Sequence, residues 1–146
     1  MVQLIRGVTV TKLKVIEHDK GNIYHALKKS EESYREFGEA YFSTVQQGIF
    51  KGWKQHQRMT LNIVVPVGAI RFYFVCENSI NDNKETASIE LSSANYQRIT
   101  VEPGIWMGFK GVEEGLNLLL NIASIPHDPS EAVSKKEDYW MYLFQS

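Results

Sequence analysis

The chain has 146 residues, of which 43% are hydrophobic, 12% aromatic and 23% charged, and this composition excludes a disordered, collagen-like or coiled-coil protein. The length suits one domain with its own core and no need of disulfide bonds, so we expect residues 1–146 to form a single domain. The 16 Lys and Arg against 17 Asp and Glu give a formal net charge of −1, without the basic excess that nucleic acid binding requires.

The cytoplasm is the expected compartment, with no membrane partner. The segment 1–6 lacks the charged start and long apolar core of a signal peptide, and no apolar run reaches the roughly eighteen residues of a membrane span. The single cysteine, Cys76, follows the apolar run 72–75 and is expected to be a buried small hydrophobic residue.

The first forty residues predict two strands and a short helix. Residues 8–16 alternate apolar and polar side chains, which is typical of a strand, and 18–21 carry turn residues before a second candidate strand over 21–27. Ser30 followed by two acids favours a short helix over 30–37 that ends at Gly38.

The rest of the chain is almost wholly β in character. Turn signals, among them 78–84, separate strands expected over 39–45, 48–53, 60–65, 69–77, 87–91, 97–101, 106–110 and 116–123. Short strands at this spacing predict an antiparallel sandwich or barrel. The apolar segments 63–65 and 118–120 predict strands covered on both faces, by a second sheet or a partner subunit. Of this part of the chain, only the C-terminal end is expected to be helical. The helical segment begins at Pro129, continues through 135–136 and reaches the aromatic run 139–144.

A basic segment is the first candidate for function. Lys51, Lys54, His56 and Arg58 lie within eight residues, and a strand would place the last three on one face. Such a face suits an anion such as a phosphate or a sugar carboxylate, while the alternative is a charged, solvated edge strand. The apolar strands that follow favour a position near the mouth of a pocket.

We expect neither a metal nor another cofactor. The segment 54–56 offers one neutral nitrogen ligand, His56, and no carboxylate follows on the next strand, whereas a stable transition-metal site wants three or four ligands. The other histidines are scattered along the chain at positions 18, 25 and 127.

Four segments, in order and spacing, resemble the dTDP-4-dehydrorhamnose 3,5-epimerase family. They are Lys-Gly-Trp-Lys-Gln-His at 51–56, Val-Pro-Val-Gly at 65–68, Leu-Ser-Ser-Ala-Asn-Tyr-Gln-Arg at 91–98 and Pro-Gly-Ile-Trp-Met-Gly-Phe at 103–109. The resemblance runs from about residue 8 to about 131. It implies a cupin-type antiparallel β-barrel (jelly roll), so that the fold class is all-β with a short C-terminal helical segment. It also implies a homodimer that acts on a nucleotide-linked 4-keto-6-deoxyhexose, a dTDP-hexose, in bacterial O-antigen or lipopolysaccharide synthesis.

The chain departs from the family at the functional positions. The resemblance places Lys54 where the family has its histidine base and Lys51 where it has an arginine. Leu61 occupies the position of the family lysine that stabilises the enolate, Leu120 that of the tyrosine acid, and Met107 that of a further histidine. Proton abstraction next to a ketone needs a base, a cation for the enolate oxygen and an acid.

Two hypotheses therefore stay open. In the first, the protein is an epimerase or isomerase with a rearranged catalytic set, Lys54 and His56. In the second, it is a non-catalytic cupin that binds a nucleotide sugar or a partner enzyme, and ordinary 3,5-epimerisation is near background. A lysine base requires burial or a cationic neighbour that disfavours its charge. The candidate substrate-binding residues are Lys20, Lys51, Arg58, Asn62 and Trp106.

Overall fold

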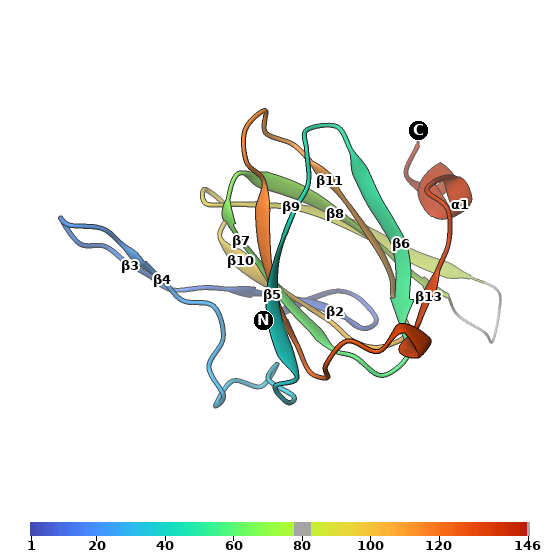
Figure 1. Ribbon diagram of the computed structural model, residues 1–146, viewed down its shortest axis with the longest axis horizontal. Coiled ribbons are helices and arrows are strands. Elements are labelled where there is room, and N and C mark those ends of the chain that lie inside the picture. The colour runs from blue at the N-terminus through green and yellow to red at the C-terminus, as the bar shows by residue number, and fades with distance from the viewer. Residues whose placement is uncertain (78–82, 146) are drawn as a thin grey trace.

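Two antiparallel sheets make up the body of the protein, which a computed structural model describes over residues 1–77 and 83–145 (Figure 1). The six-stranded sheet has the order β1 (Val2–Ile5), β2 (Val8–Lys12), β10 (Gln97–Val101), β7 (Leu61–Val67), β12 (Leu118–Ala123), β5 (Glu39–Thr44). The five-stranded sheet has the order β13 (Ala132–Ser134), β6 (Phe50–His56), β11 (Trp106–Gly111), β8 (Ala69–Glu77), β9 (Lys84–Ser92). This arrangement confirms the predicted all-β jelly roll.

The hydrophobic core lies between the two sheets. Its members come from alternate positions of facing strands, and include Ile63, Phe72, Phe74, Ile99 and Leu119, each at most 3% exposed. All residues of β7 from 61 to 65 are buried, as the apolar run predicts. In β12 burial alternates instead, so one face of that strand is only partly covered.

The C-terminal segment contains less helix than expected. A 3-10 turn (Pro129–Glu131) leads directly into β13, which pairs with the edge of β6, so the predicted helix over 129–136 is wrong. The unpaired backbone groups of an edge strand explain this outcome, because β13 satisfies them. A short helix, α1 (Asp138–Met141), and a 3-10 turn (Tyr142–Phe144) follow.

The aromatic tail packs on the outer face of the five-stranded sheet. Trp140 is 4% exposed and forms a second hydrophobic cluster with Trp53, Val75 and Trp106. The Trp53 indole N–H donates to the Glu137 carbonyl at 2.7 Å. This cluster fixes β6 from outside the core.

The predicted helix over 30–37 is also wrong, because the segment forms turns that cross the outer face of the six-stranded sheet. The Glu31 carboxylate accepts from the Lys28 amide at 2.8 Å, and Arg98 donates to Glu31 at 2.9 Å and to the Ser33 hydroxyl at 2.6 Å. Arg98 is 1% exposed, and its guanidinium also binds the Ala26 carbonyl at 2.7 Å. Glu31, one of the acids that suggested a helix start, thus serves a buried arginine together with Ser33.

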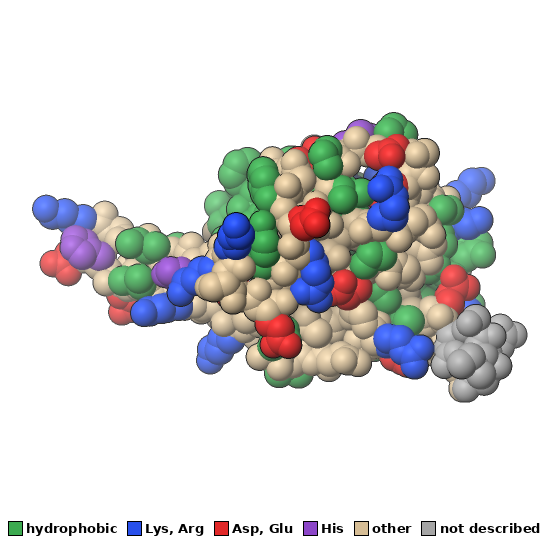
Figure 2. All heavy atoms as spheres, turned by 90° about the horizontal axis from the view of Figure 1, so that it is seen from below, with side chains coloured by type: hydrophobic (Ala, Val, Ile, Leu, Met, Phe, Trp, Pro, Cys, Tyr) green, Lys and Arg blue, Asp and Glu red, His purple; other side chains and the backbone are tan. Residues whose placement is uncertain are grey.

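A two-stranded arm, β3 (Val15–Ile16) with β4 (Ile23–Tyr24), projects from the body. The expected strand over 8–16 thus divides into β2 and β3, and the one over 21–27 shortens to two residues. The predicted turn closes the arm, where the Gly21 amide donates to the His18 carbonyl at 3.0 Å. Figure 2 shows hydrophobic side chains along the arm between charged ones.

Three smaller expectations can be compared with the structure. Cys76 is 8% exposed, as predicted, and burial raises the pKa of its thiol. No helix within the described residues is long and apolar enough to cross a membrane. The predicted turn 78–84 falls mostly on 78–82, outside the described residues.

Candidate functional site

A cavity of about 280 Å³ opens between the two sheets. Five strands supply its lining: β5 and β12 with β7 on one wall, β6 and β11 on the other. The lining residues are Tyr41, Ser43, Lys51, Gly52, Lys54, His56, Leu61, Ile63, Met107, Phe109, Leu119 and Asn121. Polar groups thus gather over an apolar floor, which is typical of small-molecule sites.

Strand β6 contributes the basic groups of the cavity. Lys54 and His56 share a face because side chains two residues apart point the same way. Lys51 joins them because the pairing of β6 with β11 is irregular: Lys54 pairs with Met107 and Lys51 with Phe109, so three steps on β6 match two on β11. The predicted face combined Lys54, His56 and Arg58; the structure keeps the first two on the cavity wall and adds Lys51.

His56 forms a pair with a buried carboxylate. Its Nδ1 contacts Glu131 Oε1, and the Glu131 side chain is 1% exposed. With Nδ1 donating to the carboxylate, the neutral ring carries its lone pair on Nε2. Nε2 makes no hydrogen bond to any residue that the structure describes, so it is free to accept a proton at the cavity wall.

Glu131 is fixed by the loop between β6 and β7. Its Oε2 accepts from the amides of Gln57 and Arg58 at 3.1 Å each and of Met59 at 3.3 Å. Burial raises the pKa of this carboxyl, but the hydrogen bonds from His56 and the backbone amides outweigh burial, so its pKa lies below the usual value. Glu131 is therefore an anion at neutral pH and holds the His56 ring in place.

Lys51 bridges the two walls of the cavity. Its Nζ donates to Ser43 Oγ and to the Thr44 carbonyl, both at 3.1 Å, and lies 5.6 Å from the Phe109 ring centroid. Lys54 lines the same cavity and is exposed. The two ammonium groups give the cavity a positive charge that suits an anionic ligand or an enolate oxygen.

A phenol lies on the opposite wall. Tyr41, on β5, accepts a hydrogen bond from Asn121 Nδ2 on β12 at 3.0 Å. Asn121 is 2% exposed and its Oδ1 is buried, with no partner among the described residues. This pair brings a hydroxyl group to the cavity wall and holds it with a buried amide.

The apolar floor matches part of the family resemblance. Leu61 and Met107 line the cavity, where the resemblance expects the enolate-stabilising lysine and a further histidine. Leu120, expected at the position of the acid, does not line it; its neighbours Leu119 and Asn121 do, because alternate residues of β12 face inward. Asn121 is thus one of the two β12 residues that reach the cavity.

Arg58 and Asn62 lie outside the cavity. Arg58 follows the end of β6, is 61% exposed in its side chain, and donates to Asp128 at 3.1 Å, so it does not share the face of Lys54 and His56. Asn62 points to the outer face of β7, where it donates to the Ser33 carbonyl at 3.1 Å. The structure therefore gives both residues roles in holding loops.

The other two binding candidates, Trp106 and Lys20, do not line this cavity either. Trp106 is 4% exposed within the aromatic cluster outside the five-stranded sheet, and its indole N–H donates to Glu77 at 2.9 Å. Lys20 lies in the turn that closes the projecting arm. No three His, Cys, Asp or Glu side chains within the described residues come together in a way that could hold a metal ion.

Sequence reasoning missed Glu131, Tyr41, Ser43 and Asn121. For Tyr41 and Ser43 a signal existed, because both occupy one face of the strand expected over 39–45. For Glu131 there was none, since it lies 75 positions from His56 and only the tertiary fold joins them.

Comparison with solved structures identifies the proteins that share this architecture. A dTDP sugar isomerase from Desulfovibrio desulfuricans is 28% identical, with a TM-score of 0.87 over 92% of this chain and 87% of the other. A 3,5-epimerase from Legionella pneumophila, solved with dTDP-4-keto-L-rhamnose, is 15% identical, with a TM-score of 0.82 over 94% and 77%. A sugar 3,4-ketoisomerase from Thermoanaerobacterium thermosaccharolyticum, solved with TDP, is 20% identical, with a TM-score of 0.72 over 96% of each chain.

Searches by sequence add nothing to this result, because no family model and no curated protein matches the chain. The cupin-type fold expected from the resemblance is confirmed by the structural matches. The structural neighbours of this chain are dTDP-sugar epimerases and isomerases.

Proposed function

We propose that the protein is an isomerase of nucleotide-linked sugars that removes a proton next to the ketone of a dTDP-4-keto-6-deoxyhexose, in the manner of a 3,5-epimerase. The observation that carries this proposal is the His56–Glu131 pair on the wall of a basic cavity. The dTDP-sugar isomerase and epimerases among the structural neighbours support the substrate class. We assign the protein to bacterial O-antigen or lipopolysaccharide synthesis in the cytoplasm, as the family resemblance implies.

His56 acts as the general base. Its Nε2 accepts the proton from the carbon beside the ketone, and Glu131 stabilises the imidazolium that forms. Because Glu131 also binds three consecutive backbone amides, the imidazole stays oriented toward the cavity. The family resemblance expects a histidine base at position 54, where this chain has Lys54. The proposed base, His56, lies two residues further along the same face of β6.

Lys54 supplies the cation. The enolate formed by proton removal carries its negative charge on the C4 oxygen, and an ammonium group within the cavity stabilises it. The family resemblance expects this lysine at Leu61 on the floor, but here the charge comes from β6. The cation thus occupies the position where the family has its base, and Lys51 adds a second positive charge nearby.

The size of the cavity decides which part of the substrate enters. A volume of about 280 Å³ lies at the lower limit for small-molecule sites, roughly 300 Å³. It accommodates one sugar ring and leaves the nucleotide outside the mouth. The keto sugar is thereby placed among His56, Lys54 and Tyr41.

A second candidate is a cupin that binds the nucleotide sugar without turning it over. It is favoured by the apolar side chains Leu61 and Met107 at two positions where the resemblance expects functional groups. Such a protein binds dTDP but exchanges no protons.

One experiment separates the two functions. The protein is incubated with dTDP-4-keto-6-deoxyglucose in deuterium oxide, and deuterium at C3 and C5 is followed by NMR and mass spectrometry. We expect incorporation well above the rate without enzyme. If dTDP binds but no deuterium enters, the protein is a binding cupin; if neither occurs at millimolar concentration, both candidates are excluded.

We also propose a homodimer. Within the described residues β3 and β4 pair only with each other. Tyr24 contacts the Tyr96 ring of the body, yet Ile23 and Tyr24 stay 58% and 44% exposed, and a two-stranded hairpin is marginally stable in water. On β5, Phe42 is 66% exposed beside the half-buried outer face of β12. A second copy that covers these apolar groups explains both features. Sedimentation equilibrium at micromolar concentration should give twice the mass of the chain; a monomer would contradict the dimer.

A further inference from the structure

We propose that Tyr41 is the second proton-transfer residue of this site, which delivers a proton to the sugar carbon on the face opposite His56, and that Asn121 is its positioning residue. The proposal rests on the function proposed above. Inversion at a carbon requires that the proton leave from one face and return to the other. A single base returns the proton to the face from which it came, so His56 alone gives exchange without inversion.

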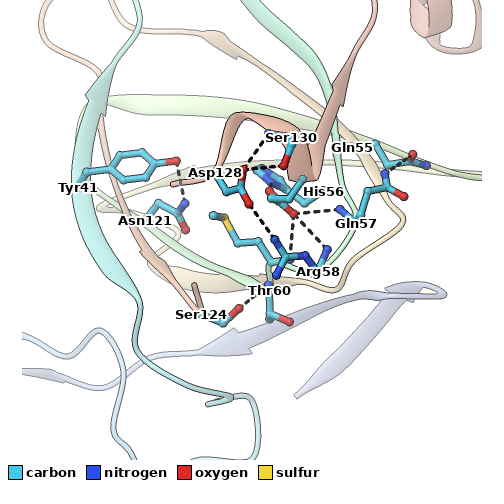
Figure 3. Close-up of polar contacts among 12 residues, drawn as sticks. Tyr41, Gln55, His56, Gln57, Arg58, Thr60, Asn121, Ser124, Asp128 and Ser130 are labelled. Atoms are coloured by element: carbon cyan, nitrogen blue, oxygen red, sulfur yellow. Dashed lines mark hydrogen bonds and ion pairs between the residues drawn. The ribbon is translucent and has the colours of Figure 1, made fainter. Parts of the chain in front are cut away.

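The two groups belong to opposite walls of the cavity. His56 lies on β6 of the five-stranded sheet and Tyr41 on β5 of the six-stranded sheet, and both line the same space. In Figure 3 the Tyr41 side chain extends from β5 toward the interior, where it meets Asn121. A sugar ring between the sheets therefore presents one face to the imidazole and the other to the phenol.

The hydrogen bond from Asn121 prepares the phenol to donate. Asn121 Nδ2 occupies an acceptor site of Tyr41 Oη at 3.0 Å, so the phenolic O–H points elsewhere and is free to donate. The same N–H stabilises the oxygen when it carries negative charge after the proton has left. Ser43, the other hydroxyl on the lining, already accepts from Lys51, and an alcohol gives up a proton less readily than a phenol.

Burial holds the Asn121 amide beside the phenol. Asn121 is 2% exposed and its Oδ1 is closed to solvent, so the side chain has little freedom to turn away from Tyr41. A buried amide that contacts a hydroxyl group on the cavity wall is suited to positioning that group.

The proton transfers balance without a redox partner. The C–H bond breaks toward His56 Nε2 and its electron pair enters the enolate. The enolate carbon then takes the proton from the Tyr41 hydroxyl, whose O–H electron pair remains on the phenolate oxygen as the new C–H bond forms. Imidazolium and phenolate return to their starting states by proton exchange with solvent.

The test compares Tyr41→Phe with wild type and with Tyr142→Phe, which removes a phenol that is 56% exposed at the C-terminus. Deuterium incorporation and inversion at C3 and C5 are measured in the same sample, and dTDP affinity by calorimetry. We expect Tyr41→Phe to keep exchange within about threefold of wild type while inversion falls about a hundredfold or more. Tyr142→Phe should match wild type in both.

The remaining outcomes overturn the assignment. Inversion at the wild-type rate in Tyr41→Phe shows that another group is the acid. Loss of exchange together with inversion, with dTDP binding intact, shows that the phenol is needed for proton removal. Absence of exchange in wild type refutes the proposed function itself, and with it this role of Tyr41. Asn121→Leu should lower inversion more than exchange; an equal loss of both, with dTDP binding intact, would contradict its positioning role.

Discussion

At the scale of single residues, the account depends on which nitrogen of His56 carries the proton. Glu131 accepts from Nδ1 and so leaves Nε2 as the basic nitrogen. The amide of a glutamine at position 131 could donate to Nδ1 instead, which would place the ring proton on Nε2 and block the base. The carboxylate therefore governs catalysis without reaching the substrate.

Glu131→Gln should accordingly lower deuterium exchange by about a hundredfold or more while dTDP binding stays close to wild type. It should also lower the free energy of unfolding by about 1–3 kcal/mol, because a buried charge-assisted contact and its amide hydrogen bonds are weakened. Exchange kinetics and urea unfolding measure the two effects. Glu114→Gln, in an exposed loop, is the matched control, and equal exchange in both variants would contradict the role of Glu131.

Lys54→Met should lower exchange by about a hundredfold, since a preorganised charge at a developing enolate contributes about 3 kcal/mol. The methionine keeps most of the side-chain volume, so stability should change little. Lys110→Met is the control, because Lys110 lies on β11 next to the lining residue Phe109 and is exposed. An unchanged rate in Lys54→Met would assign the enolate charge to Lys51 instead.

At the scale of elements, the sequence predicts most strands of the two sheets but not β1, β13 or the covering segment 30–37. Strands β8 and β10 have the predicted bounds, because alternating or wholly apolar runs bounded by turn residues identify them. The segment 30–37 and strand β13 were missed because partners distant in sequence determine both: buried Arg98 organises the first, and the open edge of β6 the second. Neither partner can be identified from the local sequence of the segment that it organises.

The candidate site likewise contains some residues that the sequence predicts and others that it does not. The shared face of Lys54 and His56 was predictable from spacing, and both line the cavity, whereas Lys51 reaches it through the irregular pairing of β6 with β11. Glu131 and Asn121 could not be chosen from the sequence, since their roles depend on the side chains that the fold places against them. Arg58 was misplaced because β6 ends at His56 and the alternation ends with it.

Arg98→Met tests the covering segment. Loss of the guanidinium removes the donor to the Ser33 hydroxyl, to Glu31 Oε2 and to the Ala26 carbonyl, and we expect a loss of about 3 kcal/mol in the free energy of unfolding. Arg71→Met removes an arginine whose side chain is 43% exposed and should cost under about 1 kcal/mol. Equal losses in urea unfolding would show that the Arg98 contacts do not anchor the segment.

At the scale of the whole molecule, the free energy of unfolding should depend on pH in the acidic range. The pKa of Glu31 is lowered because hydrogen bonds and charge from Arg98 and the Lys28 amide outweigh burial, and that of Glu131 is lowered by its contacts. A carboxyl whose folded-state pKa is depressed stabilises the fold above its unfolded value of 4.5, and this contribution is lost as the pH falls through the folded-state pKa.

The free energy of unfolding should therefore decrease as the pH falls from about 5 through the folded-state pKa values of these groups. The decrease should be smaller in Glu131→Gln, which lacks one of them. Urea titrations at a series of pH values from about 6 downward give the slope. Identical slopes for wild type and Glu131→Gln would show that Glu131 does not couple folding to protons.

The central claim is that His56 removes a proton from the carbon beside the ketone of a nucleotide sugar. The most direct measurement is the rate of deuterium incorporation at C3 and C5 of dTDP-4-keto-6-deoxyglucose by wild type, His56→Asn and His127→Asn, the last a control on an exposed loop histidine. The account predicts rapid incorporation by wild type and His127→Asn and a loss of at least about a hundredfold in His56→Asn with dTDP binding retained. Incorporation by His56→Asn at the wild-type rate would contradict it.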